Sequence, residues 1–277
     1  MAFEVQKGTL YVVPTPIGNL ADMTPRALEV LKDVDFIACE DTRITGKLLS
    51  LFDIKNSFVS YHEHNKKKQG NTVLSRLLAG ESAAIASDAG TPAISDPGED
   101  LVRKCIENGV PVVPLPGACA FVTALSASGM DSRRFCFEGF LPSDEKEKKE
   151  ALSELKSEKR TLIFYESPHR ITETASLMLE VLGDRKVCVS RELTKLNEEI
   201  TVLLLSQFCE KLKNTPPKGE YVLIIEGLKD EKPFFSDMSV EQHVEFYMKQ
   251  GMDKMNAIKA CAKDRGVSKN EIYKHFI

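Results

Sequence analysis

The stretch "SAAIASDAGTPAISDPGEDLVRKCIENG", residues 82–109, predicts the fold class by itself. It opens with a short apolar run typical of a buried strand and closes with a helical segment that ends at Gly109. Between them, Ser87–Gly98 holds two glycines, two prolines and two aspartates, and its one large side chain is Ile94. A strand, a loop without bulk and a helix form the repeating unit of an α/β protein. Such a loop also leaves space for a ligand against the backbone.

The first half of the chain repeats this unit. Apolar runs typical of strands occupy residues 10–14, 35–40, 57–61, 82–87 and 110–117. Helical patterns follow them at residues 25–34, 45–52, 71–80, 98–109 and 119–129. Thr24 as N-cap and Pro25 at the first helical position mark where the first helix begins. This alternation predicts a largely parallel sheet.

The pattern changes near Phe135. Strands predicted at 135–142, 160–167, 186–194, 199–206 and 219–227 have few helices between them, which indicates a mixed sheet in a second α/β domain. The charged segment 143–159 is typical of a helix with a solvated face. A polar stretch at 228–237 is typical of a linker, and only helical patterns follow it. We therefore expect domains at 1–117 and 118–230, a linker at 231–238 and a helical tail at 239–277.

The composition excludes several classes of protein. The chain has 277 residues, with 37 Lys and Arg against 41 Asp and Glu, and this net charge of −4 argues against a surface coated with basic groups. No apolar run reaches the length of a membrane span, and the first residues lack the pattern of a signal peptide. The seven cysteines are scattered and none forms C-x-x-C, so we expect reduced thiols, a cytoplasmic location and no structural zinc site.

Three loops that follow predicted strands are small, rich in proline and free of lysine: Pro14–Leu20, Ser87–Gly98 and Pro114–Ala120. None carries the glycine patterns that cradle phosphates, which disfavours a dinucleotide or a nucleoside triphosphate. A ligand with a ribose, an adenine and a positive centre fits better, because Asp88 and backbone carbonyls would face a cation. S-adenosylmethionine is such a ligand. Tight turns with no ligand are the alternative.

Ordered motifs between Leu10 and Gly227 resemble the tetrapyrrole methylase superfamily. They include "LYVVPTPIGNLADMTPRALEVL", "ACEDTR", "YHEHN", "SDAGTPAISDPG", "VVPLPG", "RFCFEGFLP", "TLIFYESPHR", "RELTK" and "GEYVLIIEG". The resemblance is closest to the branch that methylates the cytidine ribose 2′-hydroxyl in the decoding region of small-subunit (16S) rRNA. The C-terminal stretch "GVSKNEIYK" also resembles the small helical tail of that branch. It implies two α/β domains, S-adenosylmethionine in the cleft between them, and a homodimer.

The resemblance also implies which residues bind the cofactor. In the first half of the chain and just beyond it they are Pro16, Asp88, Ala89, Gly90, Thr91, Ile94, Ser95, Pro116, Gly117, Cys119 and Ala120. In the second domain they are Tyr165, Leu193, Gly219 and Glu220. The Asp88–Thr91 loop would receive the methionine end and the sulfonium, and Tyr165 would face the adenosine. One position departs from the family pattern, because Ala118 stands where proline is common.

Methyl transfer to a ribose hydroxyl gains from a general base, and charged residues follow three predicted strands. We expect four of them to be functional, namely Glu40, Asp41, His62 and Glu166, without assigning the base. In the alternative interpretation, Asp41 pairs with Arg43 to shape a loop, and Arg170 anchors its own helix. His62 and His64 would share one side of an extended segment, as metal ligands do, but no third ligand is evident and we expect no metal.

The tail carries the signal for nucleic acid. A helix, a glycine-containing turn, a serine N-cap and a second helix form the helix-turn-helix pattern, and basic residues outnumber acidic ones after Met248. The residues expected to contact RNA are Arg43, Arg170, Lys263, Lys269 and Lys274. A plain helical packing cap is the alternative for the tail. For the whole chain, the alternatives are a tetrapyrrole-precursor C-methyltransferase and a ligand-sensing DNA-binding regulator.

Overall fold

The computed structural model describes residues 4–229 and 233–276. The chain forms two compact units that divide between Leu228 and Lys229. The expected linker at 231–238 begins just past this division. Its residues 231 and 232 lie outside the described residues, and so do residues 1–3, 230 and 277 at the ends of the expected domains. The boundary expected at 117/118 falls inside the first unit and stays a prediction.

The first sheet is entirely parallel, as the alternation predicts. Its strands lie in the order β3 (Phe58–Ser60), β2 (Phe36–Cys39), β4 (Ala83–Ala86), β1 (Leu10–Val13) and β5 (Val112–Pro114). The intervening helices are α1 (Pro25–Asp33), α2 (Thr42–Ser50), α3 (Lys66–Leu78) and α4 (Glu99–Glu107), with the short helix η1 at Leu20–Asp22. Parallel strands place all their carboxyl ends at one edge, so the five following loops share that edge.

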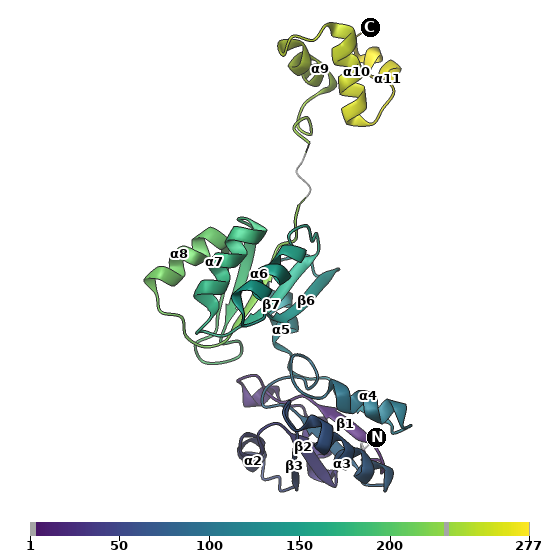
Figure 1. Ribbon diagram of the computed structural model, residues 1–277, viewed down its shortest axis with the longest axis vertical. Helices are drawn as coiled ribbons and strands as arrows, with labels where there is room; N and C mark the ends of the chain where they lie inside the picture. The colour runs from purple at the N-terminus through teal and green to yellow at the C-terminus, as the bar shows by residue number, and fades with distance from the viewer. Residues whose placement is uncertain (1–3, 230–232, 277) are drawn as a thin grey trace. The chain divides into compact units, whose positions relative to one another are not determined.

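Strand residues alternate between two cores. Tyr11, Ile37 and Ala84 face α1 and α2, whereas Leu10, Phe36 and Ala83 face α3 and α4. Figure 1 shows α2 and α3 on opposite sides of β2 and β3. Helix α3 begins five residues earlier than predicted, because its lysine-rich first turn lacks both an apolar pattern and a side-chain cap.

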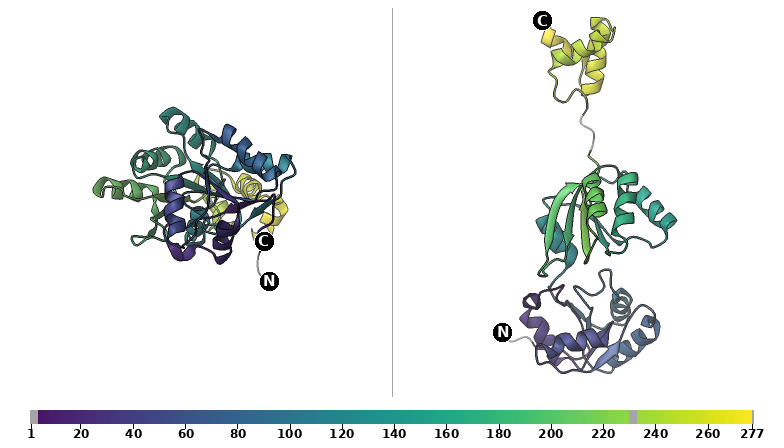
Figure 2. Two further views of the ribbon diagram at one scale, coloured as in Figure 1. Left: turned by 90° about the horizontal axis from the view of Figure 1, so that it is seen from below. Right: turned by 90° about the vertical axis from the view of Figure 1, so that its left-hand side faces the viewer.

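The second sheet is mixed, also as predicted. Its order is β6 (Phe135–Phe140), β7 (Thr161–Glu166), β10 (Tyr221–Ile225), β8 (Lys186–Arg191) and β9 (Glu199–Leu204), with only β6 and β7 parallel. The helices are α5 (Ala120–Ala127), α6 (Glu145–Glu154), α7 (Ile171–Leu182) and α8 (Leu205–Asn214). The right-hand view in Figure 2 shows this sheet with helices along its face.

The strand predicted at 199–206 is wrong in its last two residues, and the sequence interpretation missed α8. The unbroken leucine run at the end of β9 hides the change of period, because helix and strand look alike in a short apolar segment. Helices α6, α7 and α8 cover one face of the second sheet, and α5 covers the other. Helix α5 is the next element after β5, so residues 115–119 lead from the first sheet to the helix that packs on the second sheet.

The second unit is a small helical body. It consists of α9 (Val240–Lys249), α10 (Lys254–Arg265), α11 (Lys269–Tyr273) and a final turn η2 at Lys274–Phe276. Gly266 ends α10 in the left-handed conformation, with φ 65°, and the Ser268 hydroxyl caps α11 by accepting from the Glu271 N–H at 3.3 Å. This agrees with the helix-turn-helix pattern of the sequence. Among the described residues, no helix combines the length and apolar character that crossing a bilayer requires.

Candidate active site

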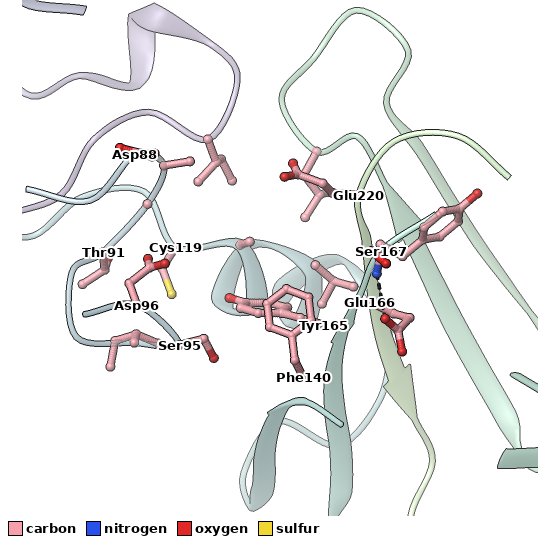
Figure 3. Close-up of a pocket in the computed structure, with 18 of the residues that line it drawn as sticks. Asp88, Thr91, Ser95, Asp96, Cys119, Phe140, Tyr165, Glu166, Ser167 and Glu220 are labelled. Atoms are coloured by element: carbon pink, nitrogen blue, oxygen red, sulfur yellow. Dashed lines mark hydrogen bonds between the residues drawn. The ribbon is translucent and has the colours of Figure 1, made fainter. Parts of the chain in front are cut away.

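A cavity of about 330 Å³ lies where the loops after β1, β4 and β5 meet the second sheet. Such a volume is within the range of small-molecule sites. The loops contribute one wall, and β6, β7, β10 and the segment after β8 contribute the other (Figure 3). The residues that line it are Ile17, Asp88, Ala89, Gly90, Thr91, Ile94, Ser95, Asp96, Cys119, Ala120, Phe140, Tyr165, Glu166, Ser167, Leu193, Lys195, Glu220, Tyr221 and Val222.

Backbone hydrogen bonds hold the three loops to one another. Thr15 and Gly90 exchange N–H···O bonds of 2.9 and 3.0 Å, which ties the β1 loop to the β4 loop. The Thr91 hydroxyl donates to the Ala118 carbonyl at 2.9 Å, which ties the β4 loop to the β5 loop. These bonds fix the loops before any ligand enters, so the wall is pre-formed.

Two glycines are required by this close packing. Gly90 has φ 87°, a conformation that side chains other than glycine rarely adopt. A Cβ on Gly117 would lie 2.5 Å from the Pro14 Cβ, closer than carbon atoms pack. The glycines therefore let the backbones of the β1, β4 and β5 loops converge at the cavity.

Side-chain contacts join the loops to the second sheet. The Asn19 N–H in the β1 loop donates to the Thr194 hydroxyl at 3.1 Å. At the start of α5, the Phe121 N–H donates to the Tyr165 hydroxyl at 3.1 Å and fixes this helix to β7. A Cβ on Gly139 of β6 would lie 2.7 Å from the Ser95 hydroxyl oxygen. The two sheets are thus held together at several points around the cavity.

Most of the predicted cofactor-binding residues meet in this cavity. Those that line it are Asp88, Ala89, Gly90, Thr91, Ile94, Ser95, Cys119, Ala120, Tyr165, Leu193 and Glu220. Four others lie beside it rather than on its surface: Pro16, Pro116, Gly117 and Gly219. Gly117 supports the wall through Pro14, and Gly219 precedes Glu220 with φ 75°. Of the residues predicted to be catalytic, only Glu166 lines the cavity.

Glu166 is fully committed to the fold. Its carboxylate is almost completely buried and accepts from the Ser167 N–H at 2.9 Å and the Thr174 hydroxyl at 2.7 Å. The Arg170 guanidinium lies 3.5 Å from it and also donates to the carbonyls of Leu141 and Pro142 at 2.7 and 2.9 Å. Arg170 therefore anchors the start of its own helix, which was the alternative left open by the sequence.

Asp41 and Arg43 also bind each other. The Asp41 carboxylate caps α2 by accepting from the Arg43 N–H at 2.8 Å, and it accepts from the Arg43 guanidinium at 3.0 and 2.6 Å. Hydrogen bonds from the Arg43 side chain lower the pKa of Asp41. Arg43 itself is highly exposed, so its other face is free for a ligand in solvent.

Glu40 follows β2 and His62 follows β3, so both stand at the edge of the sheet that carries the cavity-lining loops, but neither lines the cavity. His62 Nδ1 is buried and has no hydrogen-bond partner in the part of the chain that the structure describes, and the His62 and His64 rings meet edge to face with centroids 6.0 Å apart. Among the described residues, no cluster of three potential ligands would hold a metal ion. Burial, and then the charge of Asp88, raises the pKa of Glu40.

The cavity's first wall is acidic. Asp88 accepts from the Asp41 N–H at 3.2 Å, and burial raises its pKa. Asp96 lies on the same wall beside Cys119 (Figure 3), and burial followed by the charges of Glu40 and Asp88 raises its pKa to about 6. The wall therefore favours a cation over an anion.

The second wall holds a charged network instead. The Lys195 ammonium donates to Glu192 at 2.8 Å and to Glu220 at 2.9 Å. Burial alone would lower the pKa of Lys195, but the two carboxylates outweigh it and raise the pKa. The ring centroids of Phe140 and Tyr165 lie 5.5 Å apart, and these two rings give the same wall an apolar surface.

Sequence reasoning did not single out seven lining residues: Ile17, Asp96, Phe140, Ser167, Lys195, Tyr221 and Val222. Each of these seven residues belongs to a motif that the sequence analysis quoted. For these seven, the motif was identified but the individual side chain was not. Asp96 carried one further signal, since "SD" occurs twice in twelve residues, as "SDAG" and "SDPG". The lysines expected to contact RNA, Lys263, Lys269 and Lys274, are all exposed on the helical unit.

Proteins of known sequence match nearly the whole chain. A profile of the Tetrapyrrole (Corrin/Porphyrin) Methylases matches residues 9–209. The Ribosomal RNA small subunit methyltransferase I of Halalkalibacterium halodurans is 50% identical over 271 residues, which covers 96% of this chain and 94% of that protein. The protein of the same name from Bacillus subtilis is 47% identical over 271 residues, with 96% and 93% covered.

Solved structures share the fold. A cobalt precorrin-4 methyltransferase matches with a TM-score of 0.57 and 18% identity, over 78% of this chain and 94% of that one. The uroporphyrin III C-methyltransferase of Thermus thermophilus matches with a TM-score of 0.57 and 17% identity, over 79% and 97%. At this level of identity, the likeness is one of fold alone.

Proposed function

The chain belongs to the tetrapyrrole (corrin/porphyrin) methylase family, within it to the ribosomal RNA small subunit methyltransferase I proteins, and from this premise we propose that it methylates 16S rRNA of the small ribosomal subunit. The methyl donor is S-adenosylmethionine, and the acceptor is the ribose 2′-hydroxyl of a cytidine. The observation that carries the proposal is the pre-formed cavity. Its first wall holds the carboxylates of Asp88 and Asp96, and its second wall, across from them, holds the aromatic rings of Phe140 and Tyr165.

The side chains of the cavity fit this donor. Asp88 and Asp96 would oppose its positive charge, and Glu220 would accept hydrogen bonds from ribose hydroxyls. Tyr165 and Val222 offer apolar surface to an adenine. When bound, S-adenosylmethionine supplies a methyl group activated by a positive sulfur. The loops tied by Thr15 and Thr91 hold their shape without reorganising, and positioning of this kind can supply about 7–11 kcal/mol of a reaction barrier.

The cations proposed to contact RNA lie in two separate parts of the chain, the loop after β2 and the helical unit. Arg43 offers an exposed guanidinium at the loop after β2. Lys263, Lys269 and Lys274 supply exposed ammonium groups with no ion pair to any described residue, and such groups bind phosphates. Arg170 is the weakest member of the predicted set, because its guanidinium already serves the backbone. A homodimer and a cytoplasmic location stay predictions.

The test uses tritiated S-adenosylmethionine and small ribosomal subunits purified from a strain that lacks this protein. Nuclease mapping then locates the label. We expect one alkali-resistant ribose methyl group in 16S rRNA. If the donor binds but neither subunits nor naked rRNA accept label, the RNA assignment fails and a tetrapyrrole-precursor substrate takes its place. If the protein binds DNA and transfers no methyl group to any of these substrates, it is a regulator.

A further inference from the structure

A groove of about 740 Å³ lies between α2 and β3, the edge strand of the first sheet. Figure 1 shows this helix and this strand at one end of the molecule, away from the second sheet. Three of the lining residues are cations: Arg43 and Lys47 on α2, and Lys55 in the segment that leads to β3. Among the described residues, no Asp or Glu lines the groove. Its charge therefore suits an anionic partner.

The sequence around this groove is basic in an acidic protein. Between Thr42 and Asn71 it holds six Lys and Arg against two Asp and Glu, whereas the whole chain holds 37 against 41. The exposed ammonium groups of Lys47 and Lys55 make no hydrogen bond or ion pair with any described residue. Arg43 and Lys47 stand one turn apart on α2, where like charges cost about 0.2–0.5 kcal/mol. The fold gains nothing from grouping these cations.

A glycine in the middle of α2 also lines the groove. Gly46 costs the helix about 0.5–1 kcal/mol relative to alanine, because glycine loses more conformational freedom on folding. Packing does not require it, since a Cβ there would meet only the Phe58 ring, at an ordinary 3.9 Å. The missing side chain instead keeps the groove open, so that a bound molecule can approach the helix backbone.

Apolar side chains stand among the cations of the groove. Leu51 lines it and is 65% exposed, and the half-buried ring of Phe58 lines it as well. Proteins bind single-stranded nucleic acid with this combination, in which cations contact phosphates and unstacked bases lie against aromatic and apolar surfaces. An inorganic anion would need the cations alone and would leave the apolar side chains without a role.

The groove starts beside the donor cavity and leads away from it. Its end at Arg43 lies two residues after Asp41, whose N–H donates to Asp88 on the cavity wall at 3.2 Å. Its other end, at Lys55 and Asn56, precedes β3 and so lies toward the opposite edge of the parallel sheet. A strand of RNA whose ribose reaches the cavity can therefore continue into the groove.

We propose that the groove between α2 and β3 binds the stretch of 16S rRNA next to the methylated nucleotide, an inference that rests on the proposed function. Arg43, Lys47 and Lys55 bind phosphates of this stretch, and Leu51 and Phe58 contact an unstacked base. The groove holds the substrate without touching the methyl donor. Removal of its cations should therefore weaken RNA binding and leave donor binding intact.

The first test compares the double variant Lys47→Gln/Lys55→Gln with Lys146→Gln/Lys213→Gln. The control removes the same charge from exposed positions on α6 and α8, which cover the second sheet. Calorimetry should show wild-type affinity for S-adenosylmethionine in both. On small subunits at about 0.1 M salt, KM should rise about tenfold in the groove variant, with kcat little changed, and stay within about twofold in the control. The logarithmic salt slope of 16S rRNA binding should fall by about 1.4 in the groove variant.

The second test identifies what occupies the groove. Leu51 is replaced by the photoreactive residue p-benzoylphenylalanine, and the protein is irradiated on small subunits from a strain that lacks it. We expect a cross-link to 16S rRNA close in sequence to the methylated cytidine. The same group in place of Lys213 on α8 is the control and should give no RNA cross-link. Because this test keeps all the cations, it decides the question even if the double lysine variant folds poorly.

The assignment fails if the groove variant and its control have equal KM values and salt slopes. It also fails if the group at position 51 gives no cross-link to RNA, and a cross-link to a ribosomal protein instead would make the groove a protein-docking surface. In these cases a wild type that methylates subunits keeps the proposed function. A wild type that transfers no methyl group to subunits overturns the proposed function and this inference with it.

Discussion

The two walls of the cavity use their carboxylates in opposite ways. On the second-sheet wall, Glu166 accepts hydrogen bonds from Ser167 and Thr174, while Glu192 and Glu220 share Lys195. On the first wall, Asp96 has no partner among the described residues. The committed carboxylates stabilise the site and the uncommitted one is available for chemistry.

The largest effect on stability should come from the second-sheet wall, where the carboxylates have hydrogen-bond and ion-pair partners. We expect Glu166→Ala to lower the free energy of unfolding by about 3–5 kcal/mol, because it leaves the Thr174 hydroxyl without its acceptor and removes the buried carboxylate that faces the Arg170 guanidinium. Glu166→Gln keeps an acceptor of the same shape and should cost about 1 kcal/mol. Urea unfolding followed by circular dichroism measures both. A loss below 1 kcal/mol for Glu166→Ala would mean that this carboxylate is no more structural than Asp96.

The next effect tests how tightly the first wall packs. Gly117→Ala places a Cβ against Pro14 and should destabilise the chain by about 1–3 kcal/mol, with a measurable loss of S-adenosylmethionine affinity. Gly46→Ala is the matched control, because its Cβ would meet only Phe58 at 3.9 Å inside α2. That change should stabilise the helix by about 0.5–1 kcal/mol. Equal effects from the two substitutions would show that the loops are not close-packed.

The third prediction concerns stability against pH. The pKa of Asp96 in the folded chain, about 6, is above its ordinary value, so protonation favours the fold. This contribution is present below about pH 4 and is lost as the pH rises through 6. Asp96→Asn should therefore stabilise the protein at pH 8 by about 1–2 kcal/mol, after discounting for the water that reaches a half-buried group. The gain should nearly vanish at pH 4.

Thermal and urea unfolding at the two pH values check this prediction. Glu99→Gln, at an exposed ion pair with Arg103 on α4, is the control that should gain nothing. If Asp96→Asn is less stable than the wild type at pH 8, then Asp96 has a structural partner and stabilises the fold as the carboxylates of the second-sheet wall do.

The smallest effect on stability is expected in the helical unit. Replacing the exposed Lys263 and Lys269 by Gln should change the free energy of unfolding by less than about 0.5 kcal/mol. RNA affinity should fall, and its logarithmic salt slope should decrease by about 1.4 for the pair on single-stranded RNA. Lys213→Gln, at an exposed ion pair with Glu210 on α8, is the control. An unchanged salt slope in the double variant would remove these lysines from the RNA surface.

The sequence was sufficient for most of the architecture because the relevant signals are local. The alternation of strand and helix through residue 127 and the cluster of strands after Phe135 follow from periodicity over a few residues. The sequence signals for the starts of α1 and α11 also hold, because a side chain three residues before the bonded N–H makes each cap. Helix α8 was missed, since a run of leucines satisfies both periods until packing against the second sheet selects one.

In the candidate site, too, local motifs predicted the position of the cavity, whereas contacts between distant residues decided the state of its side chains. The motifs "SDAGTPAISDPG", "PLPGACA" and "YESPHR" locate the cavity, because loops after parallel strands must share one edge. Which carboxylate is free depends on partners far along the chain, and spacing does not reveal them. Glu166 is satisfied by Thr174 from α7, and the pKa of Asp96 is raised by burial and then by the charges of Glu40 and Asp88, which belong to other loops. The sequence alone determined the elements and the loops. Only the tertiary structure decided which side chains have hydrogen-bond or ion-pair partners within the fold and which are left to contact a bound molecule.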